Sequence, residues 1–165
     1  MNRLLAVGVL LLALVGCQRH DADAPPEAPA ADVAVGWQLT DLPEETSITY
    51  RDSVDAPGVT LTCTRADKVF SMRAPNPVEI APIERETATI TLGYETFVLA
   101  VAQEGEGALL ASAPVAPQLL RALTDAKSAR LGFRDGFIET GVDTDGVFLA
   151  FSKRCEALTA MDPAP

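Results

Sequence analysis

Most of the chain beyond residue 36 alternates between apolar and polar residues, the pattern of a strand with one buried face. Segment 59–64 (VTLTCT) shows this best, because two aliphatic residues and Cys63 fall on one side and three threonines on the other. Segment 87–93 alternates in the same way, whereas 96–102 is almost entirely apolar, which predicts a central strand. Further strands are predicted at 37–40, 47–51, 69–73, 108–112 and 128–133.

Two segments place apolar residues at helical spacing instead. The first starts with two prolines, which a helix tolerates there, and predicts a helix of about ten residues from Ala116. In the second, four residues recur on one helical face: Phe148, Phe151, Cys155 and Leu158. The alternative is a hairpin through "DTDG" (143–146) followed by a strand, but the periodicity favours a terminal helix. The order of elements predicts an α+β fold, a β-rich antiparallel sheet with one internal helix and a C-terminal helix.

Residues 1–16 have the pattern of a signal peptide, a short positive start followed by an apolar run too short to span a bilayer. The run ends in Leu14-Val15-Gly16-Cys17, which resembles the lipobox of bacterial lipoproteins. The resemblance implies that Cys17 receives a diacylglycerol, that the signal peptide is cleaved before it, and that a fatty acid such as palmitate acylates the new amino terminus. The alternative is an ordinary signal or an uncleaved anchor, with a cysteine there by chance.

An acylated Cys17 would make the lipid bilayer the first expected partner, because two or more acyl chains hold a protein firmly. The residue after the cysteine is Gln18. In the lipoproteins that the motif resembles, an Asp at this position retains the protein in the inner membrane. The resemblance therefore implies the periplasmic face of the outer membrane, with the inner membrane as the alternative. Residues 17–35 form a Pro- and Ala-rich tether, because they bring too little apolar surface to fold. The folded domain is predicted at 36–160 and a disordered tail at 161–165.

The charge of the chain narrows the choice of partners. Thirteen Lys and Arg stand against 23 Asp and Glu, a formal net charge of −10, and cleavage would remove Arg3 and leave −11. Phosphates would repel such a chain, so nucleic acid is not an expected partner. Anionic lipid surfaces would repel it as well, so the lipid on Cys17 would have to hold it there. An envelope protein is the remaining expected partner.

The cysteine count gives a second prediction. Cysteines in an oxidising compartment normally pair, and the chain has three. If Cys17 carries lipid, Cys63 and Cys155 remain as one possible disulfide. Two buried free thiols are the alternative.

Residue types for catalysis or metal binding are scarce in the predicted domain. The single histidine, His20, lies in the tether, which excludes Ser-His-Asp and Cys-His constellations from the domain. The sequence "DTDG" lacks the third acidic position and the later Glu of an EF-hand, so a turn or a helix cap by Asp143 or Asp145 is the better interpretation. We expect no catalytic residue, no metal site and no cofactor.

Two aromatic residues, Trp37 and Tyr94, are candidates for a binding patch. Packing in the core or at the sheet edge is the alternative for both. The low aromatic content, 5%, argues against a sugar cleft lined with stacking rings.

The domain also resembles small secreted proteobacterial domains of no assigned function. The shared features are an early Trp37, a strand ending in Leu61-Thr62-Cys63, a "P-x-x-LL-x-x-L" helix from Pro117, and a closing helix that ends in Cys155. None of these features is a catalytic motif, so the resemblance implies architecture and compartment only. We therefore expect a non-enzymatic, membrane-anchored periplasmic lipoprotein with a binding or assembly role in the cell envelope. One alternative is an inhibitor of a cell-wall hydrolase such as lysozyme, and a second is a carboxylate-dependent hydrolase.

Overall fold

The computed structural model describes residues 34–56, 58–75, 87–103, 108–133 and 136–160. These form nine strands and two helices, and neither helix is long and apolar enough to cross a membrane. The strands are β1 (Gly36–Asp41), β2 (Glu45–Arg51), β3 (Val59–Thr64), β4 (Val69–Pro75), β5 (Thr87–Leu92), β6 (Glu95–Gln103), β7 (Ala108–Pro114), β8 (Ala129–Phe133) and β9 (Gly136–Glu139). The helices are α1 (Pro117–Asp125) and α2 (Val147–Ala160).

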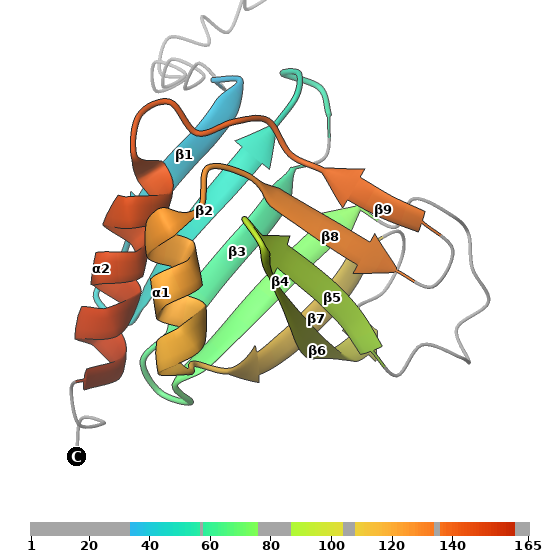
Figure 1. Cartoon of the computed structure of the whole chain (residues 1–165). Coiled ribbons are helices and arrows are strands. Elements are labelled where there is room, and N and C mark those ends of the chain that lie inside the picture. Colours follow the sequence, from blue (N-terminus) through green and yellow to red (C-terminus); the bar gives the residue numbers. More distant parts are fainter. Residues whose placement is uncertain (1–33, 57, 76–86, 104–107, 134–135, 161–165) are drawn as a thin grey trace, which may run out of the picture. The chain divides into compact units, whose positions relative to one another are not determined.

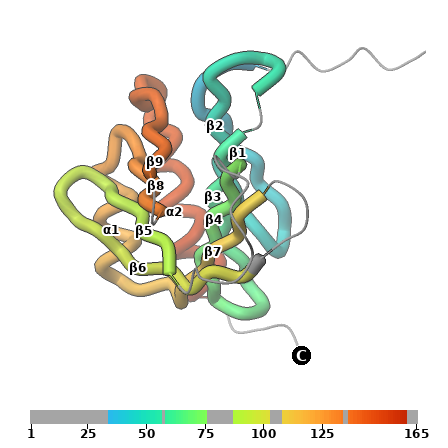
Figure 2. The backbone as a smooth tube through the Cα atoms, turned by 90° about the vertical axis from the view of Figure 1, so that its right-hand side faces the viewer, coloured from blue at the N-terminus to red at the C-terminus, as the bar shows by residue number. Residues whose placement is uncertain are grey.

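All nine strands lie in one antiparallel sheet, in the order β1-β2-β3-β4-β7-β6-β5-β8-β9. The sheet turns at β6, whose first residues pair with β5 and whose last residues, 100–103, pair with β7. A back layer of β1, β2, β3, β4 and β7 therefore faces a front layer, in which β5, β8 and β9 accompany the two helices (Figures 1 and 2).

The core fills the space between the two layers, because the strands of the back layer turn most of their apolar residues inward. In β3 the alternation is as predicted, with Val59, Leu61 and Cys63 buried and the three threonines outward. Removal of this apolar surface from water is the main driving force for the fold. The largest fully buried apolar side chains are Phe70, Phe148, Phe151, Ile48, Leu61, Met72, Ile90, Leu92, Leu99, Leu123 and Leu131.

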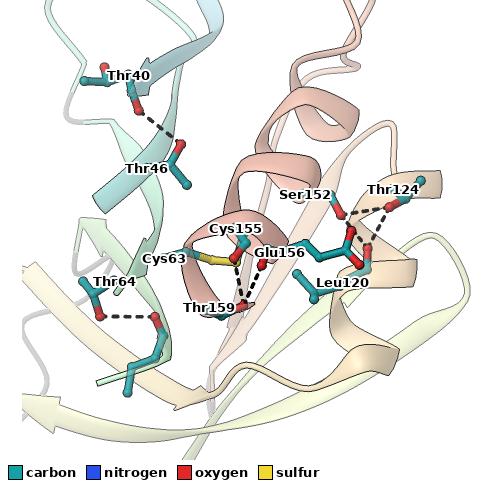
Figure 3. Close-up of a disulfide and its surroundings, with 11 residues drawn as sticks. Thr40, Thr46, Cys63, Thr64, Leu120, Thr124, Ser152, Cys155, Glu156 and Thr159 are labelled. Carbon is teal, nitrogen blue, oxygen red and sulfur yellow. Dashed lines mark hydrogen bonds between the residues drawn. A yellow bond between two sulfur atoms is a disulfide. The ribbon is translucent and has the colours of Figure 1, made fainter. Parts of the chain in front are cut away.

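The two helices pack on each other; α2 covers the inner face of the back layer at β1, β2 and β3, whereas α1 contacts β5. Helix α1 begins at Pro117, where the missing N–H of proline costs no helical hydrogen bond. The hydroxyl of Ser152 on α2 donates to the carbonyl of Leu120 on α1 at 2.8 Å, and its oxygen lies 2.8 Å from Thr124 Oγ1. This polar contact, drawn in Figure 3, fixes how the helices lie against each other.

The predicted elements agree with the structure at most positions. All eight predicted strands are present, the internal helix is confirmed, and α2 shows that the hairpin alternative for the last segment is wrong. Strand β9 was not predicted, because its four residues begin with a glycine and give no clear alternation. The apolar segment 96–102 is an interior strand as predicted, yet it is not buried on both faces, since Val98 is 63% exposed.

Three predicted regions fall wholly or mostly outside the described residues: the signal peptide 1–16, the tether 17–35 up to residue 33, and the tail 161–165. They remain predictions. The first strand begins at Gly36 and the last helix ends at Ala160.

Candidate functional site

The predicted lipidation site lies outside the described residues. Cys17 and the nearby His20 both precede the first described position. The lipid anchor therefore remains a prediction.

The predicted disulfide is present between Cys63 on β3 and Cys155 on α2. Both cysteines are fully buried, and their Cα atoms lie 5.5 Å apart, within the usual range for a disulfide. The bond joins positions 92 residues apart and holds the last helix on the back layer (Figure 3). It is a structural bond, because no solvent reaches either sulfur.

Trp37, predicted as part of a binding patch, lies instead in the core. Its side chain is only 8% exposed, and its Nε1 donates to the carbonyl of Gly141 at 2.9 Å. The ring packs 4.6 Å from Phe148 and 5.3 Å from Tyr50, centroid to centroid. The indole thus has both an apolar environment and a hydrogen-bond acceptor, and the prediction of a patch shared by Trp37 and Tyr94 is wrong.

Tyr94 has the opposite environment. It lies in the two-residue turn between β5 and β6, next to Gly93, whose φ of 62° is the left-handed conformation that glycine adopts without strain. Its side chain is fully exposed, at 106% relative accessibility. The candidate binding residue is therefore available to a partner.

Further exposed apolar side chains occur on the outer face of the front layer. One row of paired residues crosses four strands, from Val98 on β6 through Thr89 and Gly132 to Phe137 on β9. Val98 is 63% exposed and Phe137 is 54% exposed. At the usual separation of about 4.8 Å between strands, the row spans about 14 Å.

Arg130 extends this row toward the turn that holds Tyr94. Its guanidinium carbon lies 3.8 Å from the centroid of the Phe137 ring, a cation–π contact. Its Nε also lies 3.6 Å from Glu139 Oε1, an exposed ion pair of small energetic value. We call Tyr94, Val98, Arg130 and Phe137 the front patch.

Asp143, in the loop before α2, is a buried carboxylate with a structural role. Its Oδ2 accepts from the backbone N–H of Phe148 at 2.9 Å and its Oδ1 from that of Asp145 at 3.0 Å. Burial raises the pKa of Asp143, but hydrogen bonds from the following backbone amides outweigh this and hold the pKa below its usual value. Of the two predicted cap residues, Asp143 is therefore the one that binds the backbone amides at the start of α2.

Sequence reasoning missed most of the front patch. Phe137 belongs to the unpredicted β9, and Val98 belongs to the apolar run 96–102, where no alternation marks an exposed face. The signal available in the sequence was Gly132, because a glycine inside a predicted strand often marks a close approach. In the structure, a side chain there would collide with the Thr89 hydroxyl.

Comparisons with known proteins do not identify the chain. No family model, no curated protein and no solved structure matches it. Within the described ranges, no group of three or more His, Cys, Asp or Glu side chains is placed to hold a metal ion.

Proposed function

We propose that this protein is a lipid-anchored, non-enzymatic component of the cell envelope that binds another protein through the front patch. The observation that carries the proposal is the exposure of Tyr94, Val98 and Phe137 on adjoining parts of one surface. Aromatic residues and arginine are enriched where proteins bind proteins, and they supply most of the binding energy when a partner buries them.

The position of Arg130 supports the choice of partner. Its guanidinium lies over the Phe137 ring and its Nε pairs with Glu139, so the N–H groups of its two terminal nitrogens would bind a carboxylate or carbonyl of a partner. The net charge of −10 disfavours nucleic acid.

The anchor is the second part of the proposal. Acylation of Cys17 would place the domain beside a bilayer, and the 17–35 segment would give it reach, since Pro-rich linkers are extended. We place the protein at the periplasmic face of the outer membrane, with the inner membrane as the alternative.

Site-specific photo-crosslinking in intact cells tests the binding surface. A photoreactive residue at Val98 should capture one protein, which mass spectrometry identifies, and Phe137→Ser should abolish the capture. The same residue at the exposed Gln118 on α1 serves as the control. Capture that is equal from both positions, or that survives Phe137→Ser, would show that the patch is not the binding surface. A cell-wall hydrolase as the captured protein would favour the inhibitor alternative.

A fatty-acid probe tests the anchor independently. The wild-type protein should be labelled and should fractionate with membranes, and Cys17→Ala should lose both properties. Retention of the unlabelled variant in the membrane fraction contradicts the lipid anchor.

A further inference from the structure

Strand β9 is the last strand at one end of the sheet, next to β8 (Figure 1). The register of this pair decides which backbone groups face away from β8. The N–H of Thr140 donates to the carbonyl of Ala129 at 3.0 Å, and in an antiparallel pair such hydrogen-bonded positions occur at every second residue. The backbone groups of Ile138 therefore face β8, whereas those of Phe137 and Glu139 face the open edge.

The outward groups on this edge are available to a ligand. Phe137 and Glu139 each direct one N–H donor and one C=O acceptor outward, and within the described ranges no hydrogen bond uses them. Their side chains are accessible as well, since Glu139 is 63% exposed and Phe137 is 54% exposed. Donors and acceptors that alternate at the spacing of a strand are matched by the backbone of another extended polypeptide.

The opposite end of the sheet is protected from such pairing. Strand β1 is the last strand there, and the N–H of Leu42 donates to the carbonyl of Glu45 at 2.8 Å. By the same alternation, the backbone groups of Leu39 and Asp41 face outward. However, the side chain of Asp41 lies on the inner side, where its Oδ2 is 3.0 Å from Nη1 of Arg154 on α2. An inward-pointing charge on an edge strand opposes the addition of another strand.

Strand β9 lacks this protection. The side chain between Phe137 and Glu139 is that of Ile138, which packs against the core, so the inner side of this edge carries no charge on β9. Because β9 has four residues, its backbone groups alone would hold a peptide weakly. Contacts with the adjoining front patch would supply the remaining affinity.

We infer that the partner of the front patch binds through an extended segment that pairs antiparallel with β9. The inference rests on the proposed function, because it concerns the same partner and the same surface. Favourable cross-strand pairs define the segment, with an aromatic or β-branched residue opposite Phe137 and a basic residue opposite Glu139. In an antiparallel segment the basic residue comes first, and the apolar residue follows two positions later.

A second copy of this chain fits the edge less well. Antiparallel pairing of two β9 strands about Ile138 places Phe137 of each copy opposite Glu139 of the other, because these are the residues whose backbone groups face outward. An aromatic ring would then lie against a carboxylate, and the two Glu139 side chains would be diagonal neighbours on one face. A segment of another protein avoids both contacts.

Titration calorimetry tests the inference, with the full chain in non-ionic detergent and the purified protein captured through Val98 as the probe. Glu139→Pro removes the outward N–H together with the side chain, and an edge strand tolerates proline where the N–H faces away from the sheet. We expect this variant to raise the dissociation constant about thirtyfold. The matched control, Glu139→Ala, loses the side chain but keeps the N–H, and should raise it about threefold at most. Circular dichroism verifies that both variants fold.

Hydrogen exchange of the wild-type protein tests the same edge without a substitution. In the complex, the amide protons of Phe137 and Glu139 should exchange about tenfold more slowly or slower still, because each has gained a partner. The amide proton of Leu39, which faces outward on β1, is the control and should keep its rate. If Glu139→Pro does not fold, this measurement decides.

The outcomes separate the inference from the proposed function. Equal dissociation constants for Glu139→Pro and Glu139→Ala, or unchanged exchange at Phe137 and Glu139, overturn the inference alone when Phe137→Ser still abolishes binding. Failure to capture any protein through Val98, or binding that survives Phe137→Ser, overturns the proposed function and the inference with it. Capture of a second copy of this chain, with slowed exchange on β9, would assign the edge to a dimer and also overturn the inference.

Discussion

The two faces of the back layer are built from the same strands but differ in chemistry, since the inner face is mostly apolar and the outer face mostly polar. On β3, Leu61 points inward and is fully buried, while its neighbour Thr62 points outward and remains partly exposed. The inner face is held by packing, by the disulfide and by the helices, whereas the outer face has no covering element among the described residues. Stability should therefore depend on the inner face, and the outer face is open to other roles.

The largest test of this difference is Phe151→Ala on the inner side of α2. The ring is fully buried, so its loss leaves a cavity and should lower the free energy of unfolding by about 4 kcal/mol. The control, Leu149→Ala, removes a side chain that is 39% exposed on the same helix and should cost well under half as much. Urea denaturation measures both, and equal effects would contradict the assignment of the two helix faces.

Loss of the disulfide should have the next largest effect. Replacement of Cys63 and Cys155 by alanine releases a loop of 92 residues and should cost about 3 kcal/mol, somewhat less than the chain-entropy value for a loop of this length. Thermal denaturation of the variant and of the wild type, with and without reductant, measures the cost. If reductant, present during unfolding, does not lower the melting temperature of the wild type, the bond has no stabilising role.

A smaller effect is expected at Asp143, a buried charged residue in the loop before α2. Asp143→Asn keeps one acceptor oxygen and loses the other. This loss should lower the free energy of unfolding by about 1 kcal/mol near neutral pH. The pKa of Asp143 is lower in the folded state, so its contribution is present above the unfolded pKa and is lost as pH falls through the folded pKa. The wild type should lose more stability than the variant on acidification below about pH 4.

Asp145→Asn, at the exposed neighbour, is the control for this pH profile. Denaturation midpoints measured from neutral to acidic pH compare the three proteins. Parallel profiles for wild type and Asp143→Asn would show that the carboxylate is not the group responsible.

The smallest effect is expected on the outer face. Thr62→Ala should change the free energy of unfolding by no more than about 0.5 kcal/mol, as for an ordinary surface substitution. Urea denaturation of the monomeric protein at low concentration measures it. A cost comparable to that of Phe151→Ala would mean that a further part of the chain covers this face.

The fold was largely predictable because the residues of the inner face recur along the chain at the spacing of a strand or of a helix. Alternation revealed β3 and β5, and helical spacing from Phe148 to Leu158 revealed α2. The disulfide followed from the number of cysteines. These signals are local, or depend on counting, so they need no knowledge of which strands lie side by side.

The candidate site was less predictable because it depends on pairing. Val98 and Phe137 are 39 residues apart in the printed sequence and fall in the same row of the sheet only through the registers of β5 and β8. Trp37 was a candidate for the binding patch but is buried. Nothing close to it in the sequence indicates that the carbonyl of Gly141, 104 residues away, will accept its N–H.

The path of β6 through both layers has a consequence for how the domain unfolds. Its first residues pair with the front layer and its last residues with the back layer, so the layers cannot part without breaking hydrogen bonds of this strand. Partial opening, in which one layer melts while the other persists, is thereby suppressed. The amide protons of Leu99 and Val101, near the point where the strand turns, should exchange with solvent only when the whole domain unfolds, and at a rate set by its global stability.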